Sequence, residues 1–157
     1  MDQGRRRVLK GTSGAAVMGL AMTAGLLRTE SARAQAAWNK AAFETRNFND
    51  TVKAMGGASA AESKDIAIVS PDIAENGAVV PFSVASKIPK TESIALLIEK
   101  NPNTLAANFL IPEGTEAGIT TRVKMGQTSN VIALVKADGK YYYASKEVKV
   151  TLGGCGG

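Results

Sequence analysis

The stretch VIALVKADGKYYYASKEVKVTL, residues 131–152, decides the fold class. Its first run, residues 131–136, is apolar and rich in β-branched side chains, which favour strands. Its second run, residues 140–152, ends in an alternation of apolar and polar residues, which is typical of a strand with one buried face. Asp138 and Gly139 separate the runs, and this pair favours the positive φ angles of a two-residue hairpin turn. The stretch therefore predicts two antiparallel strands joined by a tight turn.

Five more β-rich runs precede this hairpin, at residues 65–69, 78–85, 93–99, 106–111 and 119–125. Turn-forming residues separate the runs, and we expect Asn76-Gly77 to adopt positive φ while the prolines end strands: Pro71, Pro89, Pro102 and Pro112. Seven strands within residues 65–152 predict a mainly β protein with the fold of an immunoglobulin-like antiparallel β-sandwich.

Residues 35–64 predict an N-terminal helix followed by a linker. Apolar or small side chains recur every three or four residues at Trp38, Ala41, Thr45, Phe48, Val52 and Met55. This spacing predicts one amphipathic helix of about four to five turns, and Gly56-Gly57 ends it. We expect the helix to cover an edge or an end of the sandwich, and we favour packing on its own domain over binding a partner. Residues 58–63 read as a linker of small residues.

Residues 1–34 predict a signal peptide. Arg5, Arg6 and Arg7 precede the apolar residues 11–27, and Ala32-Arg33-Ala34 suits a signal peptidase. The Arg5-Arg6 pair is typical of a twin-arginine signal, which predicts export of the folded protein to the periplasm. A membrane anchor is the alternative, but the apolar segment is short and weakly apolar for a stable span. We therefore expect no membrane attachment after the signal is removed.

The composition excludes many kinds of functional site. Hydrophobic residues make up 45% of the chain and charged residues 21%, as in ordinary globular domains. There is no histidine and one cysteine, which excludes a Ser-His-Asp triad, a histidine-ligated metal, an internal disulfide and a multi-cysteine metal site. We therefore predict no catalytic residue, no metal and no cofactor. Residues 1–34 carry a net charge of +4 and the rest only +1, which argues against a nucleic-acid partner.

The one cysteine, Cys155, lies among glycines at the end of the chain, with Gly153 and Gly154 before it and Gly156 and Gly157 after it. Glycine leaves the backbone free and bare of side chains, so residues 153–157 predict a mobile arm with an exposed thiol. The arm can carry the sulfur on the order of 10 Å away from the sandwich. Since the chain has no histidine to act as its base, we expect chemistry at this thiol to depend on partner proteins.

The terminal Gly-Gly-Cys-Gly-Gly, together with the signal, the helix and the sandwich, resembles the SoxY family of the bacterial thiosulfate-oxidising Sox system. Residues 72–77, DIAENG, before a strand, also resemble this family. The resemblance implies a carrier rather than an enzyme, with Cys155 holding thiosulfate-derived sulfur as an S-thiosulfonate or persulfide. It also implies four partners, whose cofactors are their own: a SoxZ-like subunit in a heterodimer, a SoxAX-like cytochrome that attaches thiosulfate, a SoxB-like hydrolase that releases sulfate, and a SoxCD-like sulfur dehydrogenase.

Three other functions fit parts of the sequence. The first is a non-enzymatic exported sandwich protein whose terminal cysteine forms an intermolecular disulfide. The second is a thiol enzyme, which the absence of a histidine base and of a resolving cysteine disfavours. The third is a ubiquitin-like sulfur carrier ending in Gly156-Gly157, which export disfavours because its activation requires cytoplasmic ATP.

Overall fold

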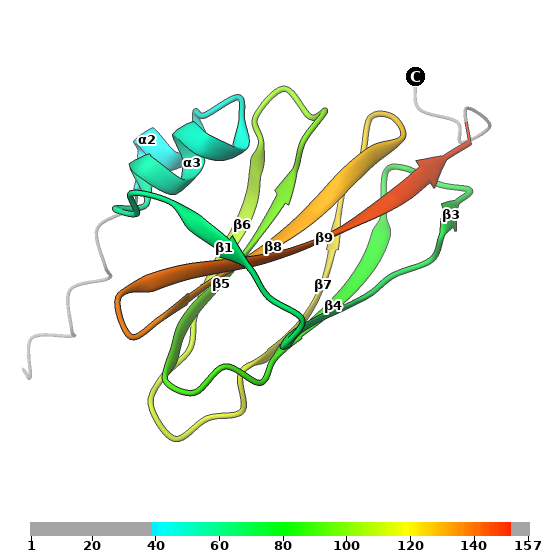
Figure 1. Cartoon of the computed structure of the whole chain (residues 1–157). Helices are drawn as coiled ribbons and strands as arrows, with labels where there is room; N and C mark the ends of the chain where they lie inside the picture. Colours follow the sequence, from blue (N-terminus) through cyan, green and yellow to red (C-terminus); the bar gives the residue numbers. More distant parts are fainter. Residues whose placement is uncertain (1–38, 152–157) are drawn as a thin grey trace, which may run out of the picture. The chain divides into compact units, whose positions relative to one another are not determined.

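The computed structural model describes residues 39–151, which contain two short helices and nine strands (Figure 1). The helices are α2 (Lys40–Phe43) and α3 (Phe48–Ala54). The strands are β1 (Ala60–Glu62), β2 (Ile66–Val69), β3 (Ile73–Ala74), β4 (Val80–Ser86), β5 (Thr91–Ile98), β6 (Leu105–Leu110), β7 (Gly118–Val123), β8 (Ser129–Ala137) and β9 (Lys140–Val150). All seven expected strands are present, and the mainly β fold class is confirmed.

The strands form two sheets that pack into a sandwich. One sheet has the order β1-β9-β8-β5-β6, with β3 also paired to β9, and the other has the order β2-β4-β7. Every pairing between the seven longer strands is antiparallel. The short strands β1 and β3, which pair with β9 in the parallel sense, were not expected from the sequence. β1 lies within residues 58–63, so the expectation of a plain linker there is wrong.

The hairpin between β8 and β9 forms as expected. Ala137 pairs with Lys140, which leaves a two-residue loop. In that loop Asp138 has φ 49° and Gly139 has φ 73°, which matches a type I′ turn. The pairing continues to Ser129 and Val148, so β9 is held along most of its length by β8.

Gly77 differs from expectation, because neither it nor Asn76 has positive φ. Instead, the Asn76 side chain accepts a hydrogen bond from the Ala78 amide at 3.0 Å. A Cβ on Gly77 would lie 2.8 Å from Cγ1 of Val150 and would also strike the Met125 carbonyl oxygen. Glycine is therefore required here for the close approach of other groups, and not for a left-handed backbone.

The expectation of one continuous helix is wrong. The chain leaves the helical path after α2, and Asn47 begins α3 with an extended φ of −152° and a side chain that accepts from the Asp50 amide at 2.8 Å. In the break, the Thr45 carbonyl accepts from the Thr104 amide at 2.9 Å. This contact with the residue just before β6 takes the place of the helical hydrogen bond that the Thr45 carbonyl would accept in a continuous helix. Gly56, with φ 92°, follows the end of α3 as expected.

The two helices lie on a face of the six-stranded sheet, and not at an edge or an end as expected (Figure 1). The central strands β5 and β8 are buried on both faces. Ile94 and Leu96 belong to the core between the sheets, whereas Leu97 belongs to the cluster that contains Val52 of α3. The unbroken apolar runs at residues 94–98 and 131–135 are the sequence signal for this two-sided burial.

Candidate functional site

The residues singled out for covalent chemistry and export lie outside the described part of the chain. This applies to Cys155, to the four glycines of residues 153–157, and to Arg5 and Arg6. Their roles therefore stay predictions. The structure does describe the root of the proposed arm, which we define as residues 149–151, comprising the last two residues of β9 and Thr151.

One flank of the root is held by the short strand β3 (Figure 1). The Lys149 amide donates to the Asp72 carbonyl at 3.0 Å, and the Thr151 amide donates to the Ala74 carbonyl at 3.1 Å. Ala74 is buried, so β3 places one small side chain in the core and pairs its backbone with the root.

The other flank is held by a side chain, because β8 does not reach this far. The pairing of β8 with β9 begins at Ser129 and Val148. Beyond it, the Val150 amide donates to Oγ1 of Thr128 at 3.0 Å. Three successive backbone amides of the root therefore have partners, which holds the strand in place up to Thr151.

The segment 72–77, which resembles the Sox family, lies against this root. Its first half supplies the carbonyls of Asp72 and Ala74, and its last residue, Gly77, leaves room for Val150. The Gly77 carbonyl also accepts from the Met125 amide at 2.7 Å. This motif thus has a structural role, which is to hold the last described residues before the proposed arm.

An ion pair lies beside the same segment. Nζ of Lys146 is 2.9 Å from Oδ1 of Asp72 and donates to the Ser70 carbonyl at 2.8 Å. The hydrogen bond and the charge of Lys146 lower the pKa of the Asp72 carboxyl below its usual value. Asp72 is thus engaged by a lysine.

The described residues contain no other arrangement that points to catalysis or metal binding. No group of three or more metal-ligating side chains comes together within residues 39–151. A cavity of about 510 Å³ lies between residues 56–61 and the hairpin residues 139–142, at the other end of β9 from the root. Its lining is mainly Gly, Ala, Ser and Tyr, with no carboxylate. Neither described helix has the length and apolar character needed to cross a membrane.

The three tyrosines at the start of β9 serve packing: Tyr142 packs against the core between the sheets, and Tyr141 and Tyr143 face the helices. Tyr141 is buried, and its hydroxyl donates to the Met55 carbonyl at 2.5 Å. Burial raises the pKa of this phenol. The ring of Tyr143 lies 5.1 Å from that of Phe48, a distance typical of packed aromatic pairs. These contacts join β9 to the helices.

Comparison with known proteins gives a family and a similar structure that covers two thirds of this chain. Residues 52–155 match the family described as sulfur oxidation protein SoxY. The structure is similar to that of the sulfur carrier protein SoxY from Chlorobium limicola f thiosulfatophilum, with 37% sequence identity and a TM-score of 0.58, over 66% of this chain and 96% of that one.

Two other structures match much more weakly. One concerns T cell recognition of the bacterial superantigen toxic shock syndrome toxin-1, with a TM-score of 0.39 and 11% identity over 55% of this chain and 99% of that one. The other is a CARDB domain from Pyrococcus furiosus, with a TM-score of 0.36 and 13% identity over 55% of this chain and 85% of that one. Neither likeness bears on the fold. No match was found among curated proteins. The SoxY match covers most of the sandwich and extends to the single cysteine, and the chain belongs to the SoxY family.

Proposed function

We propose that this protein carries sulfur in a sulfur-oxidation system and that Cys155 is the point of covalent attachment. The observation that carries the proposal is the extent of the family match, which runs to residue 155 and so includes the one thiol of the chain. The similar Chlorobium protein is itself described as a sulfur carrier. A carrier requires one covalent handle and no acid or base of its own, which fits a chain without histidine.

The proposed cycle begins with thiosulfate. The Cys155 sulfur and the terminal sulfur of thiosulfate form an S–S bond, with release of one proton from the thiol and of two electrons to a SoxAX-like cytochrome. Attack of water on the sulfonate sulfur, in a SoxB-like hydrolase, releases sulfate and leaves a persulfide on Cys155. A SoxCD-like sulfur dehydrogenase then takes six electrons from the outer sulfur, which gains three oxygen atoms from water and becomes a sulfonate. A second hydrolysis releases this sulfonate as sulfate and restores the Cys155 thiol. The metals and haems of these steps belong to the partners.

The described residues supply a firm base for this chemistry. Three paired amides hold the chain as far as Thr151, and Cys155 follows four residues later. Covalent geometry limits the distance between the Cα atoms of these two residues to about 13–14 Å. In this proposal the sandwich stays outside the partner enzymes, while the narrow glycine arm carries the sulfur into their active sites.

The sharpest experiment uses mass spectrometry of the mature protein. We expect the chain to gain the mass of one thiosulfate group when it is incubated with thiosulfate and the partner cytochrome. Cys155→Ser should fold normally and gain nothing. A sulfur adduct on the serine variant would refute Cys155 as the attachment site. A single inert disulfide with another protein, and no thiosulfate adduct, would favour the alternative of a terminal structural disulfide.

The periplasm as compartment and a SoxZ-like subunit as heterodimeric partner are part of the same proposal. Export is tested by replacing Arg5, Arg6 and Arg7 with lysine, which should leave the precursor in the cytoplasm if the twin-arginine route is used. Normal export of this triple variant would indicate the general secretion route. Co-purification of the mature chain with a second small sandwich protein would support the heterodimer.

A further inference from the structure

Lys146 connects the middle of β9 to the chain between β2 and β3. Its Nζ donates to the Ser70 carbonyl at 2.8 Å and forms the 2.9 Å ion pair with Asp72. The Asp72 side chain is 87% exposed, so the ion pair alone contributes little stability, but the Lys146 side chain is only 31% exposed. The bond to the backbone carbonyl of Ser70 is therefore the firmer of the two contacts.

The strand that follows this connection is weakly held by its own residues. β3 has two residues, and the Ile73 side chain is 56% exposed. Only Ala74 enters the core. A strand this short buries too little apolar surface to keep its place by itself, so contacts on either side of it must contribute. Lys146 provides such contacts before β3, and Gly77 provides them after it through the hydrogen bond to Met125.

Release of β3 would change where the arm begins. The amides of Lys149 and Thr151 would lose the carbonyls of Asp72 and Ala74. Regular strand pairing would then end at Val148, which faces Ser129. The bond of the Val150 amide to Oγ1 of Thr128 would then be the one backbone hydrogen bond left to the root among the described residues. Opening of that single bond would let the proposed arm begin at residue 149 instead of after Thr151, which adds about 10 Å of reach and more conformational freedom to the thiol.

We propose that Lys146 is a positioning residue of the carrier: by holding β3 against β9, it sets the point at which the arm begins. The part that concerns the arm rests on the proposed function, whereas the part that concerns β3 and the root does not. A defined starting point matters because the thiol has to reach the same depth in each partner enzyme. A longer free segment lets the thiol sample a larger volume, which lowers its effective concentration at the partner's active site. It also increases the conformational entropy that is lost when the arm enters that site.

Amide hydrogen exchange tests the structural part without any partner. Lys146→Met keeps most of the aliphatic stem and removes the charged donor, and Asp72→Asn weakens the ion pair alone. The amides at positions 149 and 151 should exchange about threefold to tenfold faster in Lys146→Met and to a smaller extent in Asp72→Asn. Amides at the centre of β8 should not change. Lys149→Met is the matched control, because it removes the same charge closer to the arm, from an exposed side chain.

Sulfur loading tests the functional part. The rate of Cys155 loading by thiosulfate and the partner cytochrome should fall about twofold to fivefold in Lys146→Met at low cytochrome concentration, through a higher KM. The rate at which a small thiol reagent labels Cys155 should stay unchanged in Lys146→Met. In Lys149→Met, both the loading rate and the labelling rate should stay unchanged. Unchanged exchange at positions 149 and 151 in Lys146→Met would overturn the proposal. Faster exchange with unchanged loading would overturn the positioning role. If the parent protein accepts no sulfur at all, the carrier function fails, and the exchange data still decide whether Lys146 holds β3.

Discussion

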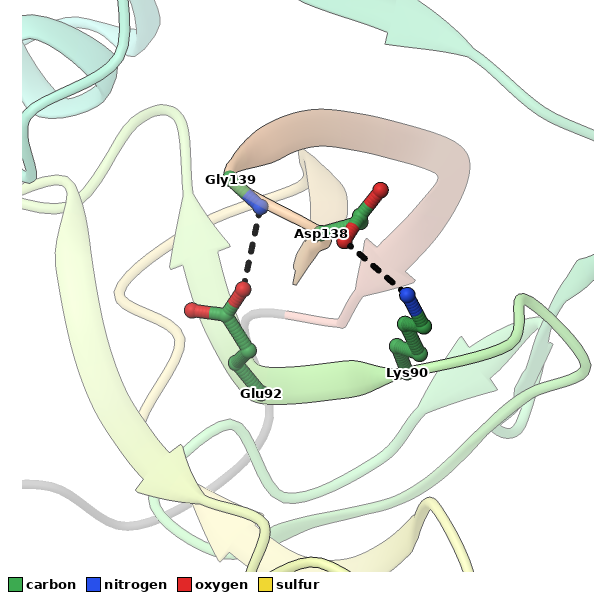
Figure 2. A network of polar contacts seen from close by, with 4 residues as sticks. All are labelled: Lys90, Glu92, Asp138 and Gly139. Atoms are coloured by element: carbon green, nitrogen blue, oxygen red, sulfur yellow. Dashed lines mark hydrogen bonds and ion pairs between the residues drawn. The ribbon is translucent and has the colours of Figure 1, made fainter.

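Lys90 and Asp138 are the two non-glycine residues with positive φ in residues 39–151, and their side chains form an ion pair of 3.4 Å (Figure 2). Lys90 lies in the turn before β5, and Asp138 lies in the turn between β8 and β9. Both side chains are largely exposed, so the ion pair itself is worth little. Glu92 adds a second link, because its Oε1 accepts from the Gly139 amide at 3.0 Å (Figure 2). The two turns are thus joined at the end of β9 that lies farthest from the arm.

Replacement of Gly139 by alanine should lower the free energy of unfolding by about 1 kcal/mol, because its φ of 73° disfavours any residue with a Cβ. The added methyl group would meet no atom within 4 Å, so the cost is conformational and not steric. Gly126→Ala is the control: it also has open space, and its φ is not positive. Urea unfolding measures the free energy of unfolding of both variants and of the parent protein. An equal effect of the two substitutions would contradict the assignment to backbone conformation.

Glu92 should contribute to the loss of stability in acid. Nζ of Lys136 donates to Oε2 of Glu92 at 2.7 Å, and this bond together with the one from the Gly139 amide lowers the pKa of Glu92. A carboxyl group with a lowered pKa in the folded state stabilises the protein above its unfolded pKa, and this contribution is lost as the pH falls through the folded pKa. The loss should begin below about pH 4.5, the ordinary value for glutamate.

The variant Glu92→Gln should therefore show a flatter change of the urea midpoint between pH 7 and pH 3 than the parent protein. Glu113→Gln serves as the control, because Glu113 is exposed and forms no ion pair within the described residues. The explanation fails if Glu92→Gln keeps the full acid dependence of the parent.

Two buried threonines should respond in opposite directions to replacement by valine. Oγ1 of Thr104 is buried with no hydrogen-bond partner among the described residues, so Thr104→Val should leave stability unchanged or raise it by up to about 1 kcal/mol. Oγ1 of Thr51 bonds the Asn47 carbonyl at 2.8 Å and Oγ1 of Thr45 at 2.6 Å. Thr51→Val should cost about 1–2 kcal/mol. Thermal unfolding of both variants measures these changes in stability. A larger loss of stability in Thr104→Val than in Thr51→Val would show that the Thr104 hydroxyl has a hydrogen-bond partner.

Gly77→Ala should loosen the root of the arm. The new methyl group would clash with the Met125 carbonyl and with Val150, which should cost about 1–3 kcal/mol and speed amide exchange at Val150. In Gly118→Ala the nearest atom to the methyl group is 3.8 Å away, so this control should change stability by less. Similar behaviour of the two variants would mean that the backbone at Gly77 yields without affecting β9.

The glycines beside Cys155 should matter for loading and not for folding. Gly154→Val and Gly156→Val add bulk on either side of the thiol, in the arm that the sequence predicts beyond the last strand. Stability and the rate of labelling by a small thiol reagent should stay near the parent values, whereas loading by the partner cytochrome should fall, because a thicker arm enters a narrow channel poorly. If both variants are loaded as fast as the parent, the arm has no steric requirement, even though the carrier function would stand.

Local residue patterns are enough to predict the elements that depend on near neighbours. The alternation in residues 147–150 and the Asp138-Gly139 pair predict the last hairpin, since strand burial and turn conformation follow from adjacent side chains and from φ preferences. The same holds for Gly56 at the end of the helical segment. Cys155 also stands out by its local setting, as the one thiol of the chain with glycines on both sides.

Contacts between distant residues decide the rest. The helical period of residues 38–55 indicates one helix, yet the bond between Thr45 and Thr104 and the cap at Asn47 divide it in two. β3 is too short to leave a pattern in the sequence, and it exists as a strand because β9 offers it partners. Gly77 has the sequence context of a turn residue, but Met125 and Val150 occupy the space beside it. The sequence alone therefore determined the long strands, the hairpin and the thiol, whereas the tertiary structure determined how the root of the arm is held, because hydrogen bonds and close approaches between residues some 75 positions apart leave no local signal.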